Sequence, residues 1–130
     1  DGLAIRYASA SPDQEKLQAE VTEILEKECA AAKAADVQTW NRYSDEFHLV
    51  FYRYCNNSRL AESAERLRSG ISIFSNQYCR ETVIQTRIDE EHLAIFQAYK
   101  DGDIEKAVQM MKTHLNDSLN YALRFLPKTF

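Results

Sequence analysis

Apolar residues recur every three or four positions along most of the chain, which is the spacing that places them on one face of an α-helix. The chain has only three Gly and two Pro, so it has few places to turn. These two features predict an all-α, antiparallel bundle of about six helices joined by short connections. The apolar positions, segment by segment, are Leu17, Val21, Ile24, Leu25 and Cys29; Trp40, Tyr43, Phe47, Val50, Phe51 and Tyr54; Leu60, Ala64, Leu67, Ile71 and Phe74; Ile88, Ile95, Phe96 and Tyr99; and Ala107, Met110, Met111, Leu115, Leu119 and Leu123.

Helix ends are expected at residues that cap or interrupt helices. Residues 1–10 look like the last turns of a longer helix. Ser11 is expected to cap a helix that starts at Pro12, and Asp36 a helix that runs to about Cys55. Ser58 is expected to cap a third helix, which reaches about Cys79.

The second half of the chain is expected to hold two further helices. The β-branched stretch 80–85 is either a loop or a helix start, and a helix follows over 86–100. Gly102 then fits the left-handed position after a helix, and Asp103 fits the next N-cap. The last helix spans about 104–126 and is ended by Pro127.

Length and charge restrict the class of protein. A chain of 130 residues is one domain, here taken as 1–130. Its net charge of −4 argues against direct binding to nucleic acid, which needs clustered cations. No apolar run approaches the ~20 residues of a membrane span, and no signal peptide is evident. Cys29, Cys55 and Cys79 match no CxxC motif, so we expect reduced thiols in a cytoplasmic protein.

The three histidines are the candidate chemistry. His48, His92 and His114 lie on the faces that three different helices would bury. A single histidine in such a place is usually a packed core residue, but three that converge in a bundle would form a metal site. Asp45, three residues before His48, is a suitable fourth ligand, whereas Ser44 would at most hold a bound water.

Other polar residues have simpler explanations. Asp89, Glu90 and Glu91 fall in the first turns of a helix, where its dipole stabilises negative charge, and Glu91 is also a candidate partner of a ligand. Asn57 fits a helix end. The arginines Arg66, Arg68 and Arg87 are expected in solvent, although one directed inward would bind a carboxylate through two hydrogen bonds.

The motifs around the histidines resemble a known family. They comprise Phe47-His48, Asn57 nine residues after His48, Leu60, Glu91-His92, Ala98, Gly102-Asp103, Ala107, Met111 and His114-Leu115. With this spacing the chain resembles the FadR-type C-terminal effector-binding (FCD) domain of GntR-family bacterial transcription regulators. The resemblance extends from Leu3 to about Phe125.

The resemblance implies six or seven helices that bind a small organic acid, often through a divalent metal, here zinc or nickel, held by one Asp and three His. His48, His92 and His114 take the three histidine positions, but the Asp position, four residues before the first, holds Ser44. Either Asp45 replaces it, or the site has three histidines only, or the effector binds without metal. Asn57, Arg66 and Arg87 are the candidate effector-binding residues.

The resemblance also implies a homodimer that contacts operator DNA through an N-terminal winged helix-turn-helix domain, which this chain lacks. No catalysis is expected, because no nucleophile–base pair is evident. Two alternatives remain. In a di-iron metalloenzyme, Asp45-x-x-His48 and Asp89-x-x-His92 would supply ligands, although the glutamates that it also needs (Glu26, Glu62 and Glu65) have outward helical phase. In a structural dimerisation module, the histidines would simply be buried.

Overall fold

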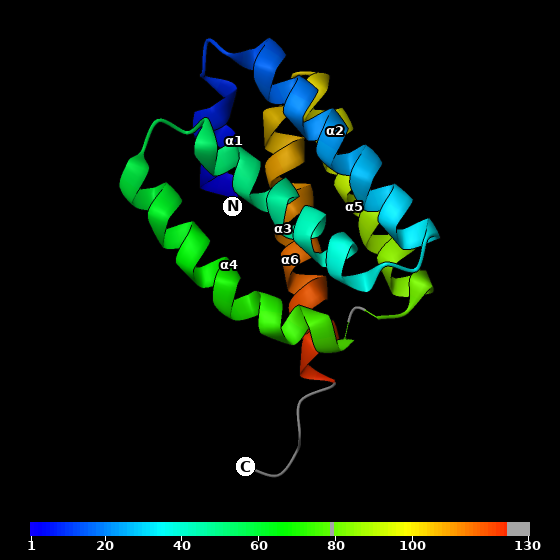
Figure 1. Ribbon diagram of the computed structural model, residues 1–130. Coiled ribbons are helices and arrows are strands. Elements are labelled where there is room, and N and C mark those ends of the chain that lie inside the picture. Colours follow the sequence, from blue (N-terminus) through cyan, green and yellow to red (C-terminus); the bar gives the residue numbers. More distant parts are fainter. Residues whose placement is uncertain (79, 125–130) are drawn as a thin grey trace.

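Six helices make up the described part of the computed structural model, which covers residues 1–78 and 80–124, without the side chains of 71–78. They are α1 (Gly2–Ser9), α2 (Gln14–Lys33), α3 (Val37–Arg53), α4 (Ser58–Tyr78), α5 (Thr82–Lys100) and α6 (Ile104–Leu123) (Figure 1). The described residues contain no strand. The prediction of an all-α bundle of about six helices is therefore confirmed.

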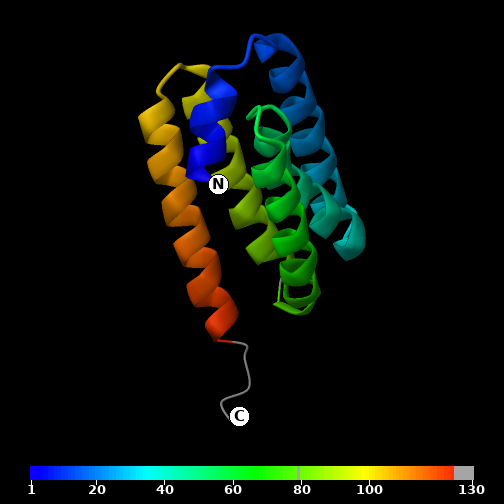
Figure 2. The ribbon, with the colours of Figure 1, turned by 90° about the vertical axis from the view of Figure 1, so that its left-hand side faces the viewer.

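Helix α3 lies at the centre of the arrangement. It packs against α2, α4 and the short helix α1, and it also touches α5. Helices α5 and α6 form an antiparallel pair, with α2 beside α5 and α1 beside α6 (Figures 1 and 2). Helix α4 contacts mainly α3 and lies at the edge of the bundle.

Small residues bring α1 close to the centre of the bundle. Ala4 and Ala8 are fully buried together with Ile5. A Cβ atom on Gly2 would lie only 3.0 Å from Cγ1 of Val108, so a larger residue there would push α1 away from α6. The main core is completed by Leu17, Val21, Ile24, Leu25, Phe47, Val50, Phe51, Ile95, Phe96, Ala98, Tyr99, Ala107 and Met111.

Two predicted caps and one turn are confirmed. Oδ1 of Asp36 accepts a hydrogen bond from the backbone N–H of Thr39 at 3.2 Å, and Oδ1 of Asp103 accepts one from Lys106 at 3.1 Å. Gly102 has a φ of 80°, the left-handed conformation that the α5–α6 turn requires.

One predicted helix start was wrong, and one open alternative is decided. Helix α2 begins at Gln14 rather than Pro12, because Ser11 belongs to the turn and its Oγ accepts a hydrogen bond from the N–H of Asp13. Helix α5 begins at Thr82, so the stretch 80–85, expected to be either a loop or a helix start, contains the helix start. Packing outweighs the low helix propensity of this β-branched stretch, since Ile84 packs against the buried cluster that contains Trp40.

Three leucines predicted to be buried are exposed. Leu67 is 68% exposed because α4 turns Ala64 and the partly buried Arg68 towards the bundle instead. Leu119 and Leu123 are 57% and 54% exposed. Helix α1 spans only ~12 Å, so it does not cover this last part of α6, which is ~30 Å long. The predictions for the side chains of Ile71 and Phe74, for Cys79, and for 125–130 lie outside the described residues.

Candidate metal centre

Three imidazole rings from three helices meet in the core. His48 on α3, His92 on α5 and His114 on α6 are 3%, 0% and 4% exposed. The ring centroid of His48 lies 5.0 Å from that of His92 and 5.3 Å from that of His114, and the last two are 4.7 Å apart. One nitrogen of each ring lies within 4.8 Å of the other two. The predicted convergence of the histidines is confirmed.

Phe47 forms one wall of this histidine cluster. Its ring is fully buried and stacks on that of His92, with centroids 4.1 Å apart and an interplanar angle of 23°. Its edge also meets the ring of His48 at 5.5 Å. Because Phe47 and His48 are neighbours in α3, the same helix supplies both an apolar support and a candidate ligand.

Each histidine faces a carboxylate through its Nδ1 atom. Nδ1 of His92 lies 3.0 Å from each carboxylate oxygen of Glu28. Nδ1 of His48 lies 2.8 Å from Oδ2 of Asp1, and Nδ1 of His114 lies 3.4 Å from Oε1 of Glu91. A carboxylate that accepts Nδ1–H leaves the Nε2 lone pair available, which is the usual arrangement behind a metal-binding histidine.

The Nε2 atoms of His92 and His114 have the spacing that a shared ion requires. Nε2 of His92 lies 3.1 Å from Nε2 of His114. Two nitrogens bound to one zinc ion at ~2.0–2.1 Å would be ~3.3 Å apart in tetrahedral geometry. If both rings carry their proton on Nδ1, two lone pairs face each other here, and a cation between them removes the repulsion. The donor set therefore fits a divalent metal.

The charge state of the rings also suits a metal. Burial lowers the pKa of His48 well below its usual value, and the positive charge of Arg68 lowers it further. Burial, followed by the charge of His114, does the same to the pKa of His92. These two imidazoles are therefore neutral at physiological pH, and neutral imidazole is the form that binds metal.

A buried carboxyl pair lies behind His92. Glu28 is fully buried, and Asp89 is 4% exposed and accepts a hydrogen bond from Nε1 of Trp40 at 2.9 Å. Burial raises the pKa of Glu28 to about 7. Burial, followed by the hydrogen bond with Glu28, raises the pKa of Asp89 to about 8. Two adjacent buried carboxyl groups do not both ionise readily, so the pair retains a proton between them.

The roles of Asp89 and Glu28 differ from those expected from the sequence. The prediction that Asp89 serves the helix dipole is wrong, because its side chain is buried and hydrogen-bonded to Trp40 and Glu28. Glu28 was not among the predicted site residues, although it follows Val21 and Ile24 by seven and four residues and so shares their buried face. This helical phase was the signal in the sequence that could have identified it.

Asp45 does not belong to the group of close ligand atoms that the three histidines form. Oδ1 of Asp45 lies 3.6 Å from Nη1 of Arg68, and Ser44 is half-buried. Nη2 of Arg68 lies 3.4 Å from Oδ2 of Asp1, which also contacts His48. Arg68 is therefore the arginine that is directed inward, and it connects Asp45 to the histidine cluster.

The remaining candidate residues lie on the surface. Arg66 is exposed, and the side chain of Arg87 is 63% exposed at 3.9 Å from a carboxylate oxygen of Asp117. Asn57 is exposed, and its Oδ1 accepts a hydrogen bond from the backbone N–H of Leu60 at 3.1 Å. This hydrogen bond makes Asn57 the N-cap of α4, so the prediction that Ser58 caps this helix was wrong, and Ser58 is instead its first residue.

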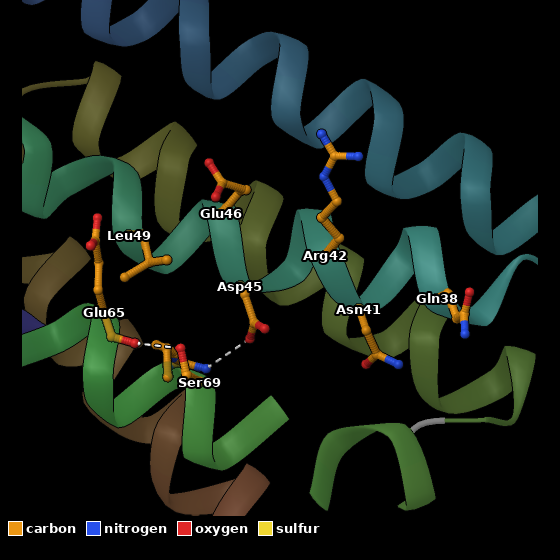
Figure 3. A pocket seen from close by; sticks show the side chains of 9 residues that line it. Gln38, Asn41, Arg42, Asp45, Glu46, Leu49, Glu65 and Ser69 are labelled. Carbon is orange, nitrogen blue, oxygen red and sulfur yellow. Dashed lines mark hydrogen bonds and ion pairs between the residues drawn. The ribbon is translucent and has the colours of Figure 1, made fainter. Parts of the chain in front are cut away.

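A pocket of about 560 Å³ opens between α3 and α4 (Figure 3). Asn41 and Asp45 precede His48 by seven and three residues, so all three lie along one face of α3. Arg68 lines the pocket from α4 and contacts Asp1 beside the histidine cluster. All of its lining residues except Leu49 carry polar side chains; the lining consists of Gln38, Asn41, Arg42, Asp45, Glu46, Leu49, Glu65, Arg68 and Ser69.

Comparisons with known proteins identify one family. The model of the FCD domain matches residues 1–117. No curated protein and no solved structure matches the chain. Among the described helices, none combines the length and the apolar character needed to cross a membrane.

Proposed function

Because the chain belongs to the FCD domain family, whose members are regulatory effector-binding modules, we propose that it senses a small organic acid for a GntR-type transcription regulator. The effector would bind at a divalent ion, zinc or nickel, held by His48, His92 and His114. The observation that carries this proposal is the convergence of three buried imidazoles, each backed by a carboxylate at Nδ1.

The surroundings of the cluster support an acidic effector. A divalent ion with neutral nitrogen ligands keeps a net positive charge and has open positions, which attract a carboxylate. The adjacent pocket offers the guanidinium of Arg68, and all of its lining residues except Leu49 carry polar side chains. Asp45 is held by Arg68 and would influence the effector rather than the metal.

The rest of the proposal concerns the complete regulator. We propose a cytoplasmic homodimer in which a winged helix-turn-helix domain outside this chain binds the operator. The net charge of −4 is consistent with leaving DNA contacts to that domain. Effector binding would act by favouring one orientation of the paired DNA-binding domains. Catalysis is not part of this role.

Metal analysis tests the centre directly. Chain purified without chelator should carry about one divalent ion, and His92→Ala and His114→Ala should lose it. Asn116→Ala, an exposed change on α6, is the matched control and should retain the ion. Circular dichroism checks that each variant folds. Metal-free wild-type protein that also fails to take up added zinc or nickel would refute the metal-dependent version.

Effector binding needs a separate measurement. A panel of small organic acids should raise the melting temperature of metal-loaded protein and have less effect after chelation. Stabilisation that is equal with and without metal would favour a metal-free effector site, the second candidate, which the Ser44 substitution supports. The di-iron alternative has less support, because Glu26, Glu62 and Glu65 are exposed, as their helical phase predicted.

A further inference from the structure

We propose that Glu28 is the positioning residue of the metal centre: its buried carboxylate holds the ring of His92 and supplies the negative charge that Ser44 does not. This inference rests on the proposed metal site and assigns a role to a residue on α2, a helix that carries none of the three histidines. Glu28 would act through His92 and would not touch the ion.

The geometry singles out Glu28 among the three carboxylates. Both of its oxygens lie 3.0 Å from Nδ1 of His92, and both side chains are 0% exposed. The contact of Asp1 with His48 is shorter, at 2.8 Å, but the side chain of Asp1 is 13% exposed and also contacts Arg68. The contact of Glu91 with His114 is longer, at 3.4 Å, and the side chain of Glu91 is 26% exposed. A hydrogen bond shielded from water is stronger and less mobile than an exposed one, so Glu28 restrains its histidine most firmly.

Glu28 is itself held in place. Asp89 hydrogen-bonds to Glu28, and Oδ1 of Asp89 accepts a hydrogen bond from Nε1 of Trp40. Trp40 is 1% exposed and packs against Ala31 and Ala32, so the end of this chain of hydrogen bonds is anchored in the core. With Phe47 stacked on the ring, His92 is restrained both at its face and at Nδ1.

Ser44 leaves the proposed metal site without a negatively charged ligand. The resemblance places an anionic ligand at this position, and a neutral serine leaves three neutral imidazoles around a divalent cation. A buried carboxylate behind a ligand raises the basicity of the imidazole and offsets part of the charge of the ion. The carboxylate of Glu28 is well placed to do so because no water separates it from His92.

The test compares zinc affinities by competition with a chromophoric chelator. Glu28→Gln keeps the size of the side chain and an acceptor for Nδ1–H but removes the charge. It should weaken zinc binding about 10- to 100-fold, the usual effect of losing such a partner. Glu23→Gln is the matched control on the same helix: Glu23 is exposed and paired with Lys27, and its loss should change the affinity less than twofold.

Two further measurements separate positioning from simple structural support. Thermal unfolding in chelator reports the stability of the metal-free fold: a variant with reduced stability but unchanged zinc affinity would overturn the proposal. Long-range ¹H–¹⁵N spectra of the metal-free wild type report the tautomer of His92, which should carry its proton on Nδ1. A proton on Nε2 would also overturn the proposal, even if Glu28→Gln fails to fold.

The outcomes distinguish the two proposals. If the wild type binds zinc and Glu28→Gln binds it equally well, Glu28 has no positioning role and the metal site stands. If the wild type binds no zinc, the proposed metal site fails and the role of Glu28 fails with it. If zinc binding is weakened in Glu28→Gln but not in Glu23→Gln, and His92 of the wild type carries its proton on Nδ1, the result supports both the metal site and the positioning role of Glu28.

Discussion

The substitution Trp40→Phe should lower the stability of the chain more than its modest change in size suggests. Trp40 is 1% exposed, and its Nε1 donates a 2.9 Å hydrogen bond to Oδ1 of Asp89, which is 4% exposed. Phenylalanine cannot donate this bond, and water has little access to the carboxyl group. Asp89 would therefore lose a donor in a place where it has few replacements.

The expected cost has two parts. Leaving a buried polar group without its partner costs about 1–3 kcal/mol. The smaller ring leaves a void, which adds about 1 kcal/mol at roughly 24 cal/mol per Å³. The free energy of unfolding should therefore fall by about 2–4 kcal/mol, a large part of the ~5–15 kcal/mol of a typical domain.

Urea denaturation followed by far-UV circular dichroism measures this loss, because Trp40 is the only tryptophan and its fluorescence disappears in the variant. Asp89→Ala and the double variant complete a double-mutant cycle, which isolates the hydrogen bond. We expect a coupling of about 1–3 kcal/mol. A loss below about 1 kcal/mol together with additive single effects would refute the claim that this hydrogen bond supports the buried pair.

Three further predictions concern the same fold. Phe47→Ala should lower the free energy of unfolding by about 3–5 kcal/mol, since the ring is fully buried against His92; a loss under about 1 kcal/mol in urea denaturation would contradict this. Asn57→Ala should cost about 0.5–2 kcal/mol in the same assay through the lost cap of α4, and no loss would show that water replaces the cap. The pKa of Asp89 is raised to about 8, so the folded chain keeps a proton that the unfolded chain releases. Its contribution to the stability should therefore fall as the pH rises from about 4 to about 8, and Asp89→Asn should reduce that slope; an unchanged slope would contradict the assignment.

Helical phase explains both the successes and the failures of the sequence analysis. The stripes of α3, α5 and α6 are long and regular, so they placed His48, His92 and His114 correctly on buried faces. Glu28 follows the same phase on α2, but a charged residue is expected in solvent unless its partner is known. That partner, His92, is 64 residues away, and only the packing of α2 against α5 brings the two together.

Arg68 shows the same limit on α4. Ala64 and Arg68 share the face that turns towards α3, whereas Leu67 points to solvent. The apolar pattern alone predicted that Leu67 would face the bundle and that Arg68 would face solvent. Which face of a helix is covered depends on its neighbours, and α4 has few of them, so hydrophobic periodicity carries less information there than in the central helices.

The one-sided packing of α4 has a consequence for how quickly its backbone opens. Among its side chains at 58–70, only Ala64 is buried, so little apolar contact holds this described part of the helix to the bundle. Segments with few buried contacts detach at a lower free-energy cost than the core around them. Amide protons of residues 58–70 should therefore exchange with deuterium earlier than those of α3 and α5. Since α4 forms one wall of the pocket, a molecule could enter by displacing this wall while the histidine cluster stays assembled.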